Sequence, residues 1–517
     1  MQIITLSDIK LPVGADEKQL ISLARKKLGG AEPKYFSIRK KSLDARDKSN
    51  IRWVYSIEFS KQPQRSETPV FPRLPKEKQP KHKVLVVGSG PAGLFCAVRL
   101  LEHGVTPILI ERGAPVEERE KKIESFFESK LLDTQTNIQF GEGGAGTFSD
   151  GKLNTQTHSP LNREVLQTFV RFGAPEEILY LSKPHVGSDN LKKVVKNIRE
   201  YLISQGVEVL FHTQLTDFKV QGGSVCEAVL TTNGTERILP VSAIVLAVGH
   251  SARDTFAMLA KRSVPMHAKD FAVGVRIEHL QENIGFSQYG KAHTLLPAAD
   301  YKLVSHASER AAFTFCMCPG GFVMPSASEE GGVVTNGMSN YARDGKNANS
   351  ALIAQVRKED FGSDDPLAGV EFQRKMERTA YRAGGENYAA PVQLVGDFLR
   401  DRESSRFGEV QPTYAAGTKF AELRTVLPEP IVQALKAAIP DMDRRLKGFA
   451  APDAILTAAE TRTSSPVRIE RDESFQSVGV ARLYPCGEGA GYAGGITSSA
   501  ADGLRVAEAI FMLFNNA

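Results

Sequence analysis

The first sixty residues carry two different spacings of hydrophobic positions. Residues 16–28 place Leu, Ile and Ala on one stripe, which is the spacing of an amphipathic helix. Residues 3–6, 35–39 and 53–59 form short apolar or alternating runs, which are typical of strands. The only Trp of the chain, Trp53, falls on the apolar face of the last run. We therefore expect residues 1–60 to form a small α/β domain.

A proline-rich stretch follows this domain. Prolines stand at positions 63, 69, 72, 75 and 80. Proline fixes the backbone and removes a hydrogen-bond donor, so such a density is typical of a semi-rigid linker. We expect residues 61–80 to connect two separately folded parts.

From residue 81 onward, short apolar runs indicate several strands. The runs are 84–87, 105–110, 207–211, 215–220, 225–231 and 238–248. Gly222-Gly223 and Asn233-Gly234 are hairpin turn signals between the later runs. Residues 81–261 are expected to be the first part of a nucleotide-binding domain. Residues 262–455 look like a mixed α+β insertion, and residues 456–517 return to glycine-rich sequence that closes on a helix.

The strand at residues 84–87 runs directly into a glycine triplet and a helical segment. Gly88 permits a tight turn, Gly90 lets the backbone approach a pyrophosphate, and Gly93 lets the helix pack closely on the strand. The phosphates would then lie on amide groups at the positive end of the helix dipole. The pattern predicts a dinucleotide site of Rossmann type.

An acidic residue at the end of the second strand supports this prediction. The second predicted strand, residues 105–110, ends directly before Glu111, which stands eighteen positions past the last glycine of the triplet. A carboxylate there can accept hydrogen bonds from both ribose hydroxyls of an adenosine, and it would repel a 2′-phosphate. The combination is specific for a dinucleotide site: a strand, a glycine triplet, a helix, a second strand and an acidic residue at its end.

Composition and charge set the broad class of the protein. The chain has 517 residues, of which 41% are hydrophobic and 24% charged, ordinary values for globular proteins. The five cysteines form no disulfide framework, the start does not resemble a signal peptide, and no apolar run is long enough to span a bilayer. We expect a cytoplasmic protein without a membrane span.

The formal net charge of +5 is concentrated in the front domain. Its basic cluster includes Arg39, Lys40, Lys41 and Arg46. A cluster of this kind can attract RNA, but we favour a solvated, lysine-rich face. The sequence does not indicate an oligomeric state.

Four longer motifs carry a resemblance to a known family. They are FGEGGAGTFSDGKL (140–153), FCMCPGG (315–321), ETRTSSPVRI (460–469) and LYPCGEGAGYAGGITSSAADG (483–503). With the glycine triplet, the chain resembles the predicted bacterial FAD-dependent dehydrogenases, a family of NAD(P)/FAD-dependent oxidoreductases. The resemblance implies a Rossmann-like, three-layer FAD-binding domain of the glutathione-reductase type. Both ends of the chain would build this domain around the inserted α+β substrate domain.

The resemblance also implies which residues hold FAD. Gly88, Gly90, Pro91, Ala92 and Gly93 would hold the pyrophosphate. Glu111, with Arg112 beside it, would take the ribose, and Leu215 would offer backbone groups to adenine. Independently of the resemblance, the high glycine content of residues 140–153 predicts a loop against something flat or anionic, where Ser149 and Lys152 could contact flavin or phosphate, and a flexible surface loop is the alternative. The rest of the cofactor would lie along Gly249, Gly487, Glu488, Gly494, Gly495 and Ile496. Amides at the start of the last helix would face the flavin N1–C2 carbonyl.

Three charged residues are candidates for substrate contacts. Glu460, Arg462 and Arg468 precede the segment that closes the cofactor site. Arginines there could clamp a carboxylate or phosphate, and an internal ion-pair lattice is the equal alternative. For Cys316 and Cys318 we favour buried reduced thiols over a redox or metal role. The sequence shows no metal-binding pattern.

These observations predict an FAD-dependent oxidoreductase. A hydride would pass between flavin N5 and a small-molecule substrate or NAD(P)H, and a second nucleotide-binding motif is absent from the sequence. NAD(P)H would therefore be a diffusible co-substrate in the cleft under the insertion. The alternatives are a flavoprotein that acts on RNA, and a non-catalytic FAD-fold interaction protein.

Overall fold

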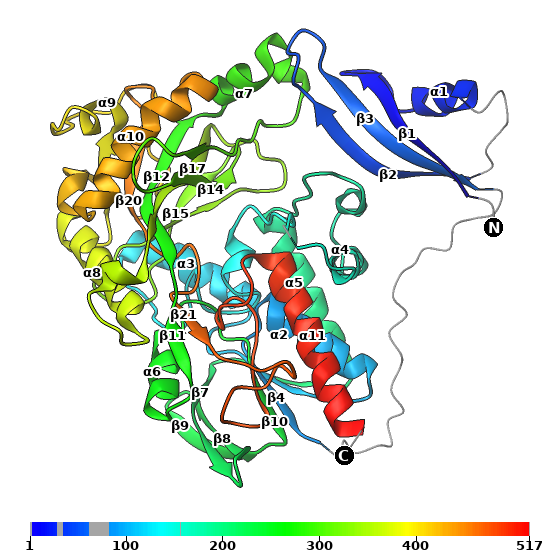
Figure 1. Cartoon of the computed structure of the whole chain (residues 1–517), viewed down its shortest axis with the longest axis vertical. Coiled ribbons are helices and arrows are strands. Elements are labelled where there is room, and N and C mark those ends of the chain that lie inside the picture. The colour runs from blue at the N-terminus through cyan, green and yellow to red at the C-terminus, as the bar shows by residue number, and fades with distance from the viewer. Residues whose placement is uncertain (1–2, 28–34, 61–81, 156, 516–517) are drawn as a thin grey trace.

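The computed structural model describes residues 3–27, 35–60, 82–155 and 157–515. The expected linker at 61–80 lies outside these residues. Figure 1 shows a small front sheet, a central body that contains the C-terminal helix, and a large insertion beside them. No helix in the described part of the chain has the length and hydropathy needed to cross a bilayer.

The front domain is a three-stranded antiparallel sheet with one helix. Its elements are β1 (Ile3–Pro12), α1 (Gln19–Lys27), β2 (Tyr35–Asp44) and β3 (Arg52–Ser60), and the strand order is β1-β3-β2. Tyr55, Ile57 and Phe59 of β3 lie in its core, whereas Trp53 is only partly buried. Several of its basic side chains are paired with acids: Arg39 with Glu58, Lys41 with Glu17, and Arg46 with Asp44.

A parallel sheet of five strands forms the centre of the body. It has the order β22-β10-β4-β5-β6. The strands are β4 (Val84–Val87), β5 (Ile108–Ile110), β6 (Glu208–Leu210), β10 (Ala243–Leu246) and β22 (Leu483–Pro485). The edge strand β22 pairs with β10, so a segment from near the end of the chain completes a sheet that begins at residue 84.

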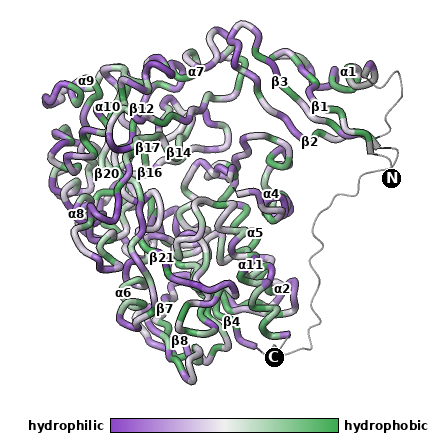
Figure 2. The backbone as a smooth tube through the Cα atoms, viewed as in Figure 1, coloured by the Kyte–Doolittle hydropathy of each residue, from purple (hydrophilic) through white to green (hydrophobic). Residues whose placement is uncertain are grey.

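The alternation of side chains along β4 explains the layers. Val84 and Val86 face a core formed with helices on one side, and Leu85 and Val87 face a second core on the other side. The helices of the first core are α2 (Pro91–Glu102), α4 (Leu161–Arg171), α5 (Ser188–Ser204) and α11 (Ile496–Asn515). Figure 2 shows the hydrophobic stretches of the tube around β4, between these layers.

The second core is closed by an antiparallel meander of three strands. These are β7 (Thr213–Gln221), β8 (Ser224–Thr232) and β9 (Thr235–Pro240). The expectation of one strand over 238–248 is wrong. Pro240 ends β9, and after Val241 and Ser242 the chain enters β10 of the parallel sheet. Proline has no N–H to continue a ladder, so the apolar run divides between two sheets.

The insertion is built on a seven-stranded sheet with the order β13-β14-β17-β12-β20-β18-β19. Its strands are β12 (Phe271–Leu280), β13 (Val304–Ser305), β14 (Ala312–Cys318), β17 (Asn347–Val356), β18 (Ala390–Leu394), β19 (Thr418–Phe420) and β20 (Ile455–Glu460). Its α-helices are α7 (Gln281–Tyr289), α8 (Ala368–Ala383), α9 (Val395–Phe398) and α10 (Glu429–Arg445). A hairpin of β15 (Phe322–Pro325) and β16 (Thr335–Met338) lies beside the sheet.

The expected boundary at residue 455 falls at the start of β20, which pairs with β12 inside the insertion sheet. The insertion therefore continues to the end of β20. Two short strands, β11 (Met266–Ala268) and β21 (Val467–Ile469), then pair where the chain enters and leaves the insertion. The remaining helical elements are α3 (Val116–Ser129), α6 (Arg253–Lys261), η1 (Ala145–Phe148), η2 (Glu176–Leu179), η3 (Gly290–Leu295), η4 (Lys358–Phe361) and η5 (Leu423–Thr425).

Candidate active site

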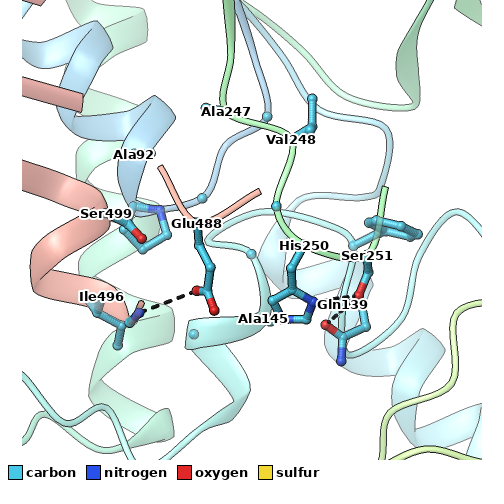
Figure 3. Close-up of a pocket in the computed structure, with 18 of the residues that line it drawn as sticks. Ala92, Gln139, Ala145, Ala247, Val248, His250, Ser251, Glu488, Ile496 and Ser499 are labelled. Carbon is cyan, nitrogen blue, oxygen red and sulfur yellow. Dashed lines mark hydrogen bonds between the residues drawn. The ribbon is translucent and has the colours of Figure 1, made fainter. Parts of the chain in front are cut away.

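One cavity of about 350 Å³ runs between the parallel sheet and the insertion. Most of the expected cofactor residues line it: Gly88, Gly90, Pro91, Ala92, Glu111, Arg112, Ser149, Lys152, Leu215, Gly249, Glu488, Gly494, Gly495 and Ile496. Gly93 and Gly487 are not part of its wall. Figure 3 shows part of the cavity, with Ala92, His250, Glu488 and Ile496 drawn from four different segments.

The three glycines after β4 have three different surroundings. Gly88 has a φ of 101°, a left-handed conformation that favours glycine. A Cβ atom at Gly93 would lie 1.9 Å from the carbonyl oxygen of Gly88, so α2 and its turn approach too closely for a side chain. A Cβ at Gly90 would meet only the Cα of Gly144 at 3.9 Å. Gly90 therefore faces open space in the cavity.

Helix α2 begins beside this open space without a capping side chain. Gly90 is its N-cap, and no acidic residue occupies the first turn. The amides of the first turn of a helix have no partner within the helix, and they carry the positive end of its dipole. This end of the cavity is suited to an anion.

Glu111 is buried and fully engaged by the protein. Its Oε2 accepts hydrogen bonds from the amide and the hydroxyl of Ser89, at 2.9 and 2.8 Å. Its Oε1 accepts from the amides of Gly113 and Gly141, each at 3.0 Å. A carboxylate offers about four lone pairs, so a ribose would have to share or replace these contacts. Ribose binding by Glu111 stays a prediction.

Arg112 is held in place from two sides. Its guanidinium forms a bidentate ion pair with Asp254, at 2.8 and 3.0 Å, and lies 4.3 Å from the centre of the Phe140 ring. Phe140 opens the glycine-rich loop, which runs along the cavity wall and contains η1. In this loop the hydroxyl of Ser149 donates to the carbonyl of Gly146, and the ammonium of Lys152 donates to the carbonyl of Met317.

The start of α11 forms the opposite wall. A Cβ atom at Gly494 or Gly495 would meet nothing within 4 Å, so both glycines leave space at the cavity. Glu488 accepts a hydrogen bond from the amide of Gly495 at 3.4 Å (Figure 3). Burial raises the pKa of Glu488 to about 7. The residue can therefore carry a proton near neutral pH.

Gly487 and Gly93 act in packing. A Cβ atom at Gly487 would lie 2.7 Å from the Cβ of Ala92, and the amide of Gly487 donates to Asp502. Neither glycine lines the cavity, so the expected cofactor contact of either is not seen in its wall.

The two expected substrate residues that reach the cavity are both in buried ion pairs. Glu460 binds the guanidinium of Arg276 at 2.9 and 3.1 Å. Arg462 binds Glu377 at 3.0 and 3.1 Å, and it also donates to the hydroxyl of Ser328. This arrangement matches the ion-pair alternative, with both side chains still at the wall.

Arg468 is not part of the cavity wall. It lies in β21, donates to the carbonyl of Gly491 at 3.1 and 3.3 Å, and stacks 4.7 Å from the Tyr492 ring. Its expected contact with a substrate therefore has no support from the cavity geometry. The side chain braces the segment that leads to α11.

His250 lines the cavity and is neutral. Burial, reinforced by Arg462 and Arg253, lowers the pKa of His250 to about 4. Its Nδ1 lies 3.0 Å from the hydroxyl of Ser251, which in turn donates to Gln139 at 3.2 Å (Figure 3). His250 lies four residues past the end of β10.

Several wall residues were not predicted from the sequence, and Cys316, which we expected to be a buried thiol, is partly exposed at the wall. Asn336 comes from β16, Phe315 and Cys316 come from β14, and Gln139 precedes the glycine-rich loop. The insertion strands bring the first three to the cavity from far along the chain. Their sequence carries no pattern for this, apart from the two closely spaced cysteines.

Three family models match this chain. "FAD binding domain" covers residues 81–122, "FAD-dependent protein, C-terminal domain-like" covers 270–463, and "Domain of unknown function" covers 3–60. The chain is also 46% identical to a protein of Clostridium beijerinckii that bears the name "Uncharacterized protein". That match covers 99% of each chain.

Solved structures give much weaker similarity. The flavin-dependent brominase Bmp2 is 13% identical over 84% of this chain and 80% of its own, with a TM-score of 0.39. A geranylgeranyl bacteriochlorophyll reductase-like protein from Thermoplasma acidophilum is 12% identical over 84% and 79%, with a TM-score of 0.36. Scores of this size do not define a shared fold.

Proposed function

Because this chain belongs to a family of FAD-dependent oxidoreductases, we propose that its cavity binds FAD and passes a hydride between the flavin and a small molecule. The small molecule is NAD(P)H or an organic substrate that enters under the insertion. One observation carries the proposal. A single cavity joins the glycine turn after β4 to the insertion residues Phe315, Asn336 and Glu460.

The residues present fit a dinucleotide. Gly90, Gly494 and Gly495 leave space on two walls where any other residue would place a side chain. The uncapped start of α2 offers amides to a pyrophosphate. Arg112 and Leu215 line the part of the cavity that would receive adenosine. FAD, when bound, supplies the hydride-accepting chemistry at its N5 atom.

The protein's own residues would orient the reactants and control protons. First-turn amides of α11 would face developing negative charge at one wall. Glu488 would hold a proton on its carboxyl near neutral pH, because burial raises its pKa to about 7. His250 would stay neutral and act through hydrogen bonds rather than charge. Glu460 and Arg462 would shape the substrate end, while their ion pairs keep them in position.

The test is an absorbance spectrum of the purified protein, followed by anaerobic mixing with NADH and, separately, with NADPH. We expect flavin bands that one of the nicotinamides bleaches, which would also name the donor. Flavin bands that neither nicotinamide bleaches would overturn the nicotinamide part and make an organic substrate the donor. A folded protein that takes up no flavin would overturn the proposal.

A further inference from the structure

The two cysteines of β14 occupy opposite environments although one residue separates them. The ladder between β14 and β17 is interrupted between Phe315 and Cys318. Cys316 sits in this bulge with a φ of 43°, in the left-handed region that a residue with a side chain rarely adopts. As a result the Cys316 residue forms part of the cavity wall, while Cys318 is fully buried behind it.

Hydrogen bonds hold the bulge in this shape. The carbonyl of Cys316 accepts from the guanidinium of Arg276 at 3.1 Å and from the thiol of Cys318 at 3.3 Å. The next carbonyl, of Met317, accepts from the ammonium of Lys152. Arg276 is itself fixed by Glu460. The strained position of Cys316 is therefore built into the buried network at the substrate end of the cavity.

The same surroundings separate the acidities of the two thiols. The neighbouring Cys318 side chain lowers the pKa of Cys316 to about 6, against the effect of burial and with help from Arg276 and Lys152. The pKa of Cys318 is raised far above its usual range by the neighbouring Cys316 side chain and by burial. A thiolate, not a thiol, is the nucleophile in sulfur chemistry.

Acidic groups around the pair act in the other direction. Glu460 raises the pKa of Cys316, and Cys316 in turn raises the pKa of Glu488. Asp150 raises the pKa of Cys318. At Cys316 the effects of Cys318, Arg276 and Lys152 outweigh those of burial and Glu460.

We propose that Cys316 and Cys318 form a thiol–disulfide exchange site on the cavity wall, with Cys316 as the attacking thiolate and Cys318 as the resolving thiol. The ligand class is a small organic disulfide. The site goes beyond the proposed function and requires neither flavin nor nicotinamide, so the two can fail separately.

The exchange is balanced in two steps. The Cys316 thiolate attacks a disulfide R–S–S–R, forms a mixed disulfide and releases one RS⁻. Cys318 then attacks the Cys316 sulfur, releases the second R–S group as a thiol and closes a Cys316–Cys318 disulfide. The protein dithiol loses two electrons, and the external disulfide gains them as two thiols.

The other cysteines have neither the bulge nor the lowered pKa of Cys316. Cys96 and Cys486 are buried, Cys486 at the wall of the same cavity, and burial raises the pKa of both thiols. A raised pKa keeps both thiols protonated and unreactive. Cys226 is partly exposed on β8, outside the cavity wall, and serves as an internal reference.

The first test is the rate of alkylation by iodoacetamide at each cysteine of the purified protein, followed by peptide mass spectrometry from pH 5 to 9. We expect Cys316 to react about tenfold faster than Cys226 at pH 7, with a midpoint near pH 6. Lys152→Met should move that midpoint upward, and Lys152→Arg should restore it. A Cys316 no faster than Cys226 would overturn the proposal.

The second test uses glutathione disulfide. We expect the wild type to form the Cys316–Cys318 disulfide without retaining glutathione. Cys318→Ser should accumulate glutathione on Cys316, reversibly by dithiothreitol, and Cys316→Ser should not react. Glutathione that remains on Cys316 of the wild type would overturn the resolving role of Cys318. The alkylation and glutathione measurements on the wild-type protein need no substitution, so a variant that fails to fold cannot decide the outcome.

Discussion

At the scale of single residues, substitutions at Gly90 and Gly93 distinguish an effect on cofactor binding from an effect on folding. A methyl group at Gly90 fits the protein alone, because its nearest neighbour is 3.9 Å away, but it would occupy the space of a pyrophosphate. We expect Gly90→Ala to melt as the wild type does and to bind FAD about tenfold or more weakly, a loss of about 1.4 kcal/mol. Calorimetric titration of flavin-free protein measures this.

The matched control is Gly93→Ala, three residues away. Its Cβ would lie 1.9 Å from a backbone oxygen, so either the turn or the helix must move. We expect a loss of about 1–3 kcal/mol in the free energy of unfolding, seen in denaturant titration. Full flavin binding by Gly90→Ala would show that the phosphates lie elsewhere.

Sequence reasoning worked best for residues whose role is local. The tight turn at Gly88 and the close packing at Gly93 depend on neighbours in the chain, and the structure places them as expected. Glu111 accepts a hydrogen bond from the amide of Gly141, and Arg468 donates to the carbonyl of Gly491 and does not reach the cavity. Both contacts are made with backbone groups that are distant in the sequence. No spacing in the sequence encodes such contacts.

At the scale of elements, a buried ion-pair group joins the cofactor domain to the insertion. Arg253 of α6 and Arg462, just after β20, both bind Glu377 of α8. Glu329 adds a second carboxylate to Arg253. The group lies behind the wall that contains Arg462, so it fixes one side of the substrate end.

Removing the negative charge of Glu377 should weaken the attachment of the insertion to the cofactor domain. Glu377→Gln leaves two buried guanidiniums without their shared carboxylate, and we expect a loss of about 3–5 kcal/mol in the free energy of unfolding. Glu371→Gln is the control on the same helix. Its exposed pair with Arg374 should contribute about 0–1 kcal/mol. Equal effects of the two substitutions in urea titration would contradict this ranking.

The same group predicts a pH dependence. Burial would raise the pKa of Glu377, but Arg253 and Arg462 outweigh it and hold the pKa far below its usual range. At Glu329 burial also raises the pKa, but Arg374 and Arg253 outweigh burial and lower the pKa to about 2. Stability from a lowered carboxyl pKa is present above the unfolded value and is lost as pH falls toward the folded one. We expect the wild type to lose stability below about pH 4.5 more steeply than Glu377→Gln.

The elements themselves were predictable where one apolar run makes one element. The strand of residues 84–87 and the final helix are of this kind. The run at 238–248 was misread because it continues through Pro240 into a different sheet. The place of β20 in the insertion depends on its pairing with β12, which is a tertiary contact.

At the scale of the whole molecule, backbone and side-chain hydrogen bonds attach the described part of the front domain to the body. Lys41 exchanges backbone hydrogen bonds with Tyr180 and Ser182, and Lys48 donates to the carbonyl of Ser287. The domain has its own core, and none of its residues in the ranges 3–27 and 35–60 lines the cavity. The linker between the two lies outside the described residues.

We therefore expect a chain that lacks residues 1–78 to fold and to bind FAD within about twofold of the full chain. Flavin titration and thermal melting of the truncated protein measure this. A truncated protein that is folded but has lost flavin would mean that the front domain helps to build the site.

The closing of the parallel sheet by β22 has a consequence for synthesis on the ribosome. Strand β4 is made early, but β22 and α11, which pack on β10 and α2, are translated only after the entire insertion. Until then the nascent chain keeps one edge of β10 unpaired and the apolar face of α2 uncovered. A premature stop codon just after β20 leaves a finished insertion sheet beside a cofactor site that lacks one wall.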